Sequence, residues 1–263
     1  MSQTAKQMQL LILAAAMAAL CSGCRPSGPA EFKKSATAFQ KISRMRVEWT
    51  AETDRGTFKQ SAELDCVAPY YHRLSVKDLT EKGIAEGTRS ALGAPKAHQE
   101  TEMLYLDGAS YLRTSGVWAS DAATEWSVSN TSNYNPRSEC EAIRQGKNPE
   151  DGPFAEDVHF LPVFNFAGAL VTNQMNYVSE TVVPDGGCRE FTVTYEDSVE
   201  SARTVTSNGE YVSYSPKPVK ATVCLGKDDA LPRQIVQGPW TVNFFYGDFV
   251  PLPAPPVSTA ENR

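Results

Sequence analysis

A period of two in hydrophobicity recurs along most of this chain and constrains its fold more than any other feature. Val47, Trp49 and Ala51 alternate with polar residues, and the same period returns over residues 58–66 after a glycine-containing turn. Successive side chains of a strand point to opposite faces, so this period indicates strands with one apolar face. Two such runs joined by a short turn predict an antiparallel hairpin.

Further strands are expected because the alternation and the turn signals recur. Asn208 and Gly209 form the strongest of these turn signals, since both residue types accept the positive φ of a tight hairpin. The expected strands are residues 71–76, 102–106, 111–113, 177–183, 188–195, 202–206, 211–214, 221–225, 233–237 and 241–246. Residues 78–99 have glycines, mixed charges and few large apolar side chains, and we expect a long loop there.

Two segments change to a helical period. Residues 31–43 place Phe32, Ala36, Phe39 and Ile42 on one side, and residues 159–171 carry a second apolar stripe. A short helix is also expected over residues 138–145. Since the helices must bury their stripes and each strand has one apolar face, the predicted class is α+β, mostly β. The expected architecture is a strongly curved antiparallel sheet, an incomplete β-barrel of about ten strands, covering two or three helices.

The first residues predict export. Residues 10–20 are uniformly apolar, which is about half the length needed to cross a bilayer and typical of a signal-peptide core. Small residues then precede Cys24, and this arrangement resembles the lipobox of bacterial lipoproteins, although Cys21 stands where leucine is usual. The resemblance implies a signal peptide at 1–23 and lipidation of Cys24. A redox or metal pair of Cys21 with Cys24, or a cleaved and soluble secreted protein, are the alternatives.

A lipidated Cys24 would anchor the chain to a membrane, with residues 24–29 as a tether. Arg25, rather than aspartate, follows Cys24. In a Gram-negative bacterium the resemblance then suggests the outer membrane, with the domain facing the periplasm. The folded domain is expected over residues 30–253, and residues 254–263 form a proline-rich tail.

Four cysteines remain after residue 24, and an exported chain with an even number of them is a candidate for disulfides. We favour Cys188–Cys224 because each of these residues lies on an expected strand of one C-terminal sheet. Cys66–Cys140 follows by elimination. Four free buried thiols are the alternative.

The order of the elements is similar to that of a known family. An N-terminal helix is followed by a hairpin, a strand–turn–strand at residues 105–112, a helix, and strands that include residues 221–235 with Asp228, Asp229, Leu231 and Pro232. This pattern resembles the LolA/LolB/LppX-like family of lipoprotein-sorting and lipid-carrier proteins. The resemblance implies a half-barrel whose apolar interior receives acyl chains. Residues 78–99 and 198–218 depart from the family outline.

The resulting functional expectation is a membrane-anchored periplasmic lipoprotein that binds a lipid acyl chain, or the lipid of another lipoprotein, and catalyses no reaction. The alternative is an envelope structural or protein-interaction lipoprotein with a filled core, whose proline-rich tail and acidic surface bind a protein. Each residue expected to line the cavity could instead be plain core. These residues are Trp49, Phe58, Leu64, Leu104, Leu106, Phe160, Phe164 and Leu170.

No catalytic motif changes this expectation. The chain has no nucleophile elbow, zinc-protease motif or phosphate-binding loop, and its three histidines, His72, His98 and His159, have no partner at ligand spacing. We therefore expect no enzyme activity, no cofactor and no metal. A formal net charge of −6 argues against a nucleic-acid partner.

Overall fold

One antiparallel sheet organises the structure, a computed structural model that describes residues 27–87, 97–106, 109–116, 126–129, 135–145, 175–206 and 209–247. The sheet has eleven strands and was expected to have about ten. Their bounds are β1 Arg44–Thr53, β2 Gly56–Asp65, β3 Tyr70–Leu79, β4 His98–Leu106, β5 Ala109–Ser115, β6 Ser127–Ser129, β7 Met175–Val183, β8 Gly186–Thr206, β9 Gly209–Gly226, β10 Pro232–Gln237 and β11 Trp240–Tyr246.

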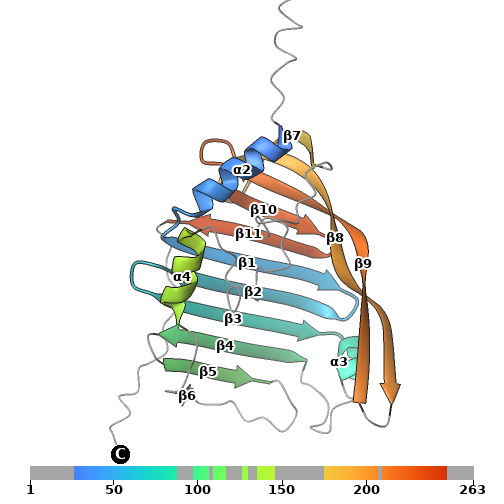
Figure 1. The fold of residues 1–263 in the computed structure, drawn as a ribbon. Helices are drawn as coiled ribbons and strands as arrows, with labels where there is room; N and C mark the ends of the chain where they lie inside the picture. Colours follow the sequence, from blue (N-terminus) through green and yellow to red (C-terminus); the bar gives the residue numbers. More distant parts are fainter. Residues whose placement is uncertain are drawn as a thin grey trace, which may run out of the picture.

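The strand order is β6-β5-β4-β3-β2-β1-β11-β10-β9-β8-β7, so each strand lies beside its neighbours in sequence except where β1 meets β11 (Figure 1). The edge strands β6 and β7 do not pair with each other, and the sheet is not closed into a barrel. The fold is mostly β, as the alternating pattern predicted.

Register assigns the apolar residues to one face. Met45, Val47 and Trp49 of β1 lie opposite Leu64, Ala62 and Gln60 of β2. They also lie opposite Tyr246, Phe244 and Val242 of β11. Directly opposed residues of antiparallel strands project to the same side. We call this side the helix face and the other side the polar face.

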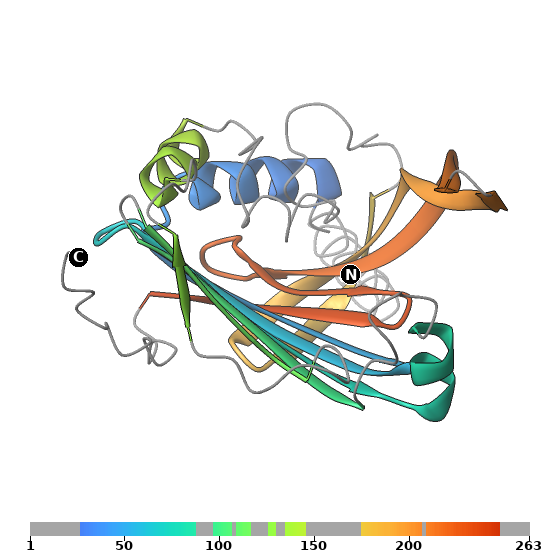
Figure 2. The same ribbon diagram turned by 90° about the horizontal axis from the view of Figure 1, so that it is seen from below.

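Two helices cover the helix face, α2 (Gly28–Phe39) and α4 (Pro136–Arg144), as Figure 2 shows. The Phe32 ring of α2 contacts the Phe191 ring of β8 edge to face, with centroids 5.9 Å apart. The α4 helix begins with Asn135, whose side chain accepts a hydrogen bond from the Arg137 amide. The predicted helices at 31–43 and 138–145 are therefore confirmed with shifted bounds.

The expectation of a loop over residues 78–99 was wrong. Strand β3 continues to Leu79, helix α3 occupies Glu81–Gly87, and β4 begins at His98. The sequence did not predict this helix because it contains Gly83, and glycine has a low helix propensity. Here glycine is required, since a Cβ at this position would lie 2.1 Å from the Arg55 carbonyl oxygen.

The expected break in the strands near residues 198–218 is also absent. Strand β8 runs for 21 residues and β9 for 18, and the two pair from Cys188↔Gly226 to Thr206↔Gly209. The resemblance to the lipid-carrier family had marked residues 198–218 as an insertion, with shorter strands expected over 202–206 and 211–214. Among the described residues no strand pairs with β9 on the side away from β8 before Thr222, so Pro216 and Pro218 sit where no amide donor is needed.

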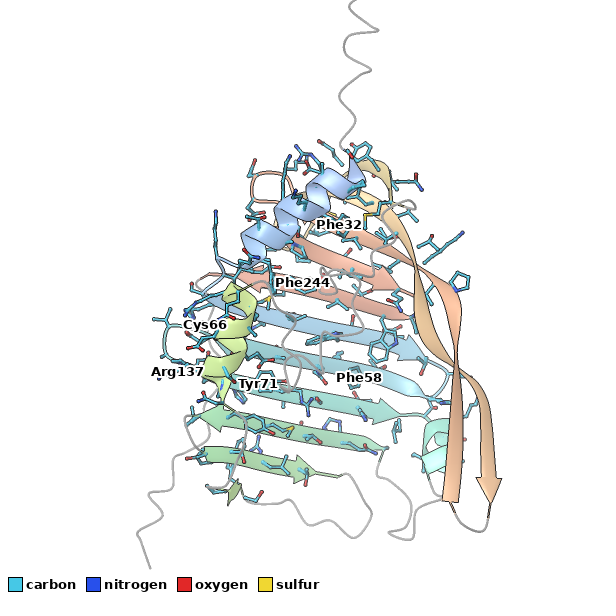
Figure 3. All side chains as sticks on the ribbon, viewed as in Figure 1. Phe32, Phe58, Cys66, Tyr71, Arg137 and Phe244 are labelled. Atoms are coloured by element: carbon cyan, nitrogen blue, oxygen red, sulfur yellow. A yellow bond between two sulfur atoms is a disulfide. The ribbon has the colours of Figure 1, made fainter. Side chains whose placement is uncertain are left out.

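Both predicted disulfides are present. Cys66–Cys140 joins the end of β2 to α4, with Cα atoms 5.6 Å apart, and Cys66 lies beside α4 in Figure 3. Cys188–Cys224 joins β8 to β9, with Cα atoms 5.5 Å apart. These separations are ordinary for disulfides.

Several predictions fall outside the described residues. They are the signal peptide at 1–23, the lipidation site Cys24, the helix at 159–171 with Phe160, Phe164 and Leu170, and the tail at 254–263.

We predict that Phe244→Ala lowers the free energy of unfolding by about 3–5 kcal/mol, because Phe244 is fully buried in the hydrophobic core of the helix face. Urea denaturation followed by circular dichroism measures the change. Val182→Ala is the matched control: Val182 is 81% exposed, and its truncation should change stability by less than about 0.5 kcal/mol. Equal effects of the two substitutions would contradict the assignment of the helix face as the core.

Candidate functional site

Three of the residues expected to line a cavity lie on the helix face. Trp49 and Leu64 are each only 2% exposed and belong to the hydrophobic core. Phe58 lies at the far end of β2 from Cys66 and α4 (Figure 3). It is partly buried and contacts the Trp240 ring edge to face at 5.1 Å. Phe58 is thus the most accessible of the three.

Leu104 and Leu106 lie on the polar face. Register places Leu104 opposite His72 and Leu106 opposite Ala109. Tyr105, between them, projects to the helix face, where its ring lies 6.0 Å from that of Tyr71. Three consecutive apolar residues leave the direction of a strand ambiguous, and the pattern alone favoured the two leucines. The structure therefore does not bring Leu104 and Leu106 together with Trp49, Phe58 and Leu64.

The polar face carries a chain of buried ion pairs instead. Glu63 is 0% exposed and pairs with Arg46, whose Nε donates to Oε1 at 2.8 Å. The Tyr70 hydroxyl donates to Glu63 Oε2 at 3.2 Å. Burial, reinforced by the negative charge of Glu63, raises the pKa of Tyr70 to about 12.

A second polar cluster lies on the same face towards the sheet edge. His72 is 2% exposed, and its Nε2 lies 2.8 Å from Glu102 Oε1. Arg113 Nη2 donates to Glu102 Oε2 at 2.5 Å, and the Arg113 guanidinium stacks over the Trp126 ring at 5.1 Å. Glu63 and Glu102, two buried carboxylates of this face, therefore each have an arginine partner, Arg46 and Arg113. We interpret these residues as structural: their mutual contacts hold neighbouring strands together on the polar face.

A pocket opens on the other side of the molecule, where the C-terminal end of α2 approaches β11. Its volume is about 390 Å³, within the range of roughly 300–1,000 Å³ that is ordinary for small-ligand pockets. The lining residues are Ala38, Lys41, Ile42, Ser43, Arg44, Asp229, Leu231, Tyr246 and Gly247.

The pocket combines an apolar wall with charged residues of both signs, including Lys41 and Asp229. Ala38, Ile42 and Leu231 supply aliphatic surface, and Lys41 adds an exposed ammonium group. Such a mixture suits an amphiphile, because apolar surface is removed from water while the charged end stays hydrated.

The Tyr246 hydroxyl is the least ordinary atom of this lining. It is buried and has no hydrogen-bond partner within the described residues. Burial raises the pKa of Tyr246 well above its usual value, and the Arg233 guanidinium lies 5.3 Å from the ring centre. A buried hydroxyl without a partner costs free energy.

Helix α2 forms one wall of the pocket and is held to the sheet by Glu31. The Glu31 side chain accepts from Lys34 Nζ at 2.6 Å and from Arg189 Nη1 of β8 at 3.0 Å. Burial alone would raise the pKa of Glu31, but the hydrogen bonds and charges of Lys34 and Arg189 outweigh burial and lower it.

None of the eight residues predicted to line a cavity lines this pocket. Its residues come from the end of α2, from the turn before β10 and from the end of β11, which are far apart in the sequence. Asp229 and Leu231 belong to the stretch that resembles the lipid-carrier family, and Ile42 to the apolar stripe of residues 31–43, but no pattern joined these residues into one site. Sequence periodicity finds faces of single elements, whereas this pocket arises where three elements end.

Two searches over the described residues gave no further site. No group of three or more His, Cys, Asp or Glu side chains there is placed to hold a metal ion. None of the helices in that part of the chain has the length and hydrophobicity to cross a membrane.

Comparisons with known proteins leave the family open. No family model matches the chain, and no curated protein matches it either. Among solved structures, a match is the crystal structure of an uncharacterized conserved protein from Thermus thermophilus, at 6% identity and a TM-score of 0.32, covering 86% of this chain and 90% of that one. A similarity at this level informs neither the fold nor the function.

We predict that Glu31→Gln lowers the free energy of unfolding at pH 7 by about 1 kcal/mol, because the amide loses charge-assisted hydrogen bonds to Lys34 and Arg189. A carboxyl group whose pKa is lowered on folding adds stability above its usual pKa of 4.5 and loses it as the pH falls through the folded value. The difference between the two proteins should therefore shrink as the pH falls below 4.5. Urea titrations from pH 7 to pH 3 measure it, with exposed Glu52→Gln as the control.

Proposed function

We propose that the protein is a lipoprotein of the bacterial cell envelope, anchored through lipid on Cys24, that binds an acyl chain without catalysing a reaction. The acyl chain belongs to a free lipid or to another lipoprotein. In this proposal residues 1–23 are removed and the domain faces the periplasm from the outer membrane. The resemblance to lipid-carrier lipoproteins and the lipobox-like sequence before Cys24 support it.

The observation that carries the proposal is the pocket of about 390 Å³ between α2 and β11. Its aliphatic wall offers the surface that an acyl chain buries, at roughly 25 cal/mol for each Å² removed from water. Lys41 at the same pocket offers a positive charge to an acidic head group. An open antiparallel sheet with two helices on one face also suits a half-barrel carrier, in which the helices cover the apolar interior.

A specific observation also favours the second candidate function, an envelope protein that binds another protein and holds no lipid. Trp49 and Leu64, expected to line a central cavity, are almost fully buried within the core. If the interior beneath the helices is filled, the pocket at the end of α2 is the candidate acyl-chain site that the described part of the chain offers. Binding of an acyl chain in this pocket is therefore the property that distinguishes the two candidate functions.

We expect Ala38→Phe to weaken lipid binding, because the ring would occupy the pocket from its α2 wall. The matched control is Thr37→Phe, which adds the same ring at the neighbouring, exposed helical position outside the lining. Native mass spectrometry of detergent-free protein measures copurified lipid, and a fluorescent fatty acid measures affinity. Wild type and Thr37→Phe should bind the fatty acid, and Ala38→Phe should bind it at least tenfold more weakly.

Either of two results would decide against lipid binding in this pocket. One is the absence of copurified lipid together with no fatty-acid binding by the wild type. The other is equal binding by Ala38→Phe and the wild type.

The anchor has its own test. Cys24→Ser should leave the protein without acyl groups, so that it partitions into the aqueous phase when cell membranes are extracted with detergent. The wild type should partition with the membranes and carry the mass of the attached lipid on a peptide that begins at Cys24. Intact residues 1–23 on protein isolated from cells would contradict the lipidation proposal.

A further inference from the structure

The side of helix α2 that faces away from the sheet is basic. Phe32 and Phe39 are buried against the sheet, whereas Lys33 and Lys34 are exposed. Lys41, just beyond the end of the helix, is exposed as well. Alternation at helical spacing thus gives α2 an apolar inner side and a charged outer side.

Helix α4 adds positive charge on the same side of the sheet (Figure 2). Cys140 and Ile143 are buried, and Arg137, Glu141 and Arg144 are exposed. In the two helices and Lys41, Glu141 is therefore the one exposed acidic residue beside five exposed basic residues. These five form what we call the basic surface: Lys33, Lys34, Lys41, Arg137 and Arg144.

The described residues neutralise little of this charge. Lys34 pairs with Glu31 at 2.6 Å, but Glu31 also accepts from Arg189 at 3.0 Å, so one carboxylate serves two cations. Lys33 and Lys41 form no ion pair with any residue that the structure describes. The basic surface is therefore opposite in sign to the whole chain, whose formal net charge is −6.

The proposed lipid attachment lies close to this surface. Helix α2 begins at Gly28, directly after Ser27, and Cys24 precedes Ser27 by three residues. Three extended residues span about 10 Å at most. The Debye length at 0.1 M salt is also about 10 Å, so charges near the membrane govern the attraction and the net charge of the chain matters less. A membrane that holds Cys24 is thus within electrostatic reach of α2.

This geometry favours a membrane over a second copy of the chain. A twofold contact through the basic surface would bring like charges together, which opposes association. Anionic phospholipids instead attract lysine and arginine at the bilayer surface, and each such residue adds to the attraction.

We propose that the basic surface binds the anionic phospholipid head groups of the membrane that holds Cys24, and so places the helix side of the domain against the bilayer. The orientation rests on the proposed anchor, because the short tether brings the surface to the membrane. Lys41 also lines the pocket, so the pocket would lie beside the head groups. An acyl chain could then enter it with little exposure to water.

The first test measures binding without the anchor. It uses the mature chain, residues 24–263, with Cys24→Ser, which contains every described residue. Cosedimentation at low salt should show at least tenfold tighter binding to vesicles of phosphatidylglycerol and phosphatidylcholine in equal parts than to vesicles of phosphatidylcholine alone. High salt should remove this difference.

The double variant K33E/R137E reverses one charge on each helix and should weaken binding to the anionic vesicles at least tenfold. The matched control is K59E/K220E, which makes the same change of charge at two exposed lysines of the polar face. It should bind as the parent chain does. Equal urea midpoints would show that both variants are folded. Ala38→Phe, which fills the pocket, should also leave vesicle binding unchanged, because the pocket holds none of the charge reversed here.

The second test measures orientation, with the lipidated wild type in anionic nanodiscs that carry a gadolinium-chelating lipid. Amide NMR signals of α4 should broaden about as strongly as those of α2. Signals of α3, which lies away from the two helices in Figure 2, should broaden much less. A domain that hangs from its N-terminus without surface contact would broaden the start of α2 but not α4.

Several results would overturn the proposal. They are equal binding to the two kinds of vesicle, undiminished binding by folded K33E/R137E, equal losses in this variant and in K59E/K220E, or unbroadened α4 signals in a lipidated protein. Binding of polyglutamate without binding of anionic vesicles would overturn it too, and would indicate an acidic protein as the partner. Absence of lipid on Cys24 would contradict the proposed function instead, since the vesicle test does not use the anchor.

Discussion

The pairing of β1 with β11 is the interaction on which the sheet depends. All other neighbouring strands in the sheet are also neighbours in sequence, whereas these two lie almost 200 residues apart in the chain. Seven residue pairs, from Met45↔Tyr246 to Ala51↔Trp240, join the half that contains β2 to β6 to the half that contains β7 to β10. Without them the apolar residues of each half would lack a continuous face, and α2 could not lie across both.

Burial of charge on the polar face follows from the same register. Because β1, β2 and β3 alternate strictly, every residue between two core positions projects to the other side. Glu63 and His72 are neighbours across β2 and β3 and are both almost fully buried. Their side-chain partners, Arg46 and Glu102, come from strands on either side. The polar face is therefore specified by charge pairs as the helix face is specified by apolar contacts.

The sequence predicted those parts of the structure that local pattern determines. The hairpin of β1 and β2, the helices α2 and α4, and both disulfides could be found from alternation, helical spacing and cysteine position. Helix α3 was missed because it depends on Gly83 approaching the Arg55 carbonyl, a contact that no local pattern encodes. The pocket was missed for a related reason: Ile42, Leu231 and Tyr246 meet only after the two halves of the sheet have joined. Leu104 and Leu106 show the opposite error, since three successive apolar residues fit either face.

The disulfide between Cys66 and Cys140 makes the attachment of α4 to the helix face depend on cysteine oxidation. Helix α4 has nine residues, too few to remain helical in water without support, and the disulfide fixes it to the end of β2. Before this bond forms, the newly synthesised chain can assemble the sheet while α4 stays poorly held. Cytosolic thiols keep cysteines reduced, so in that compartment α4 would lack its covalent link to the end of β2.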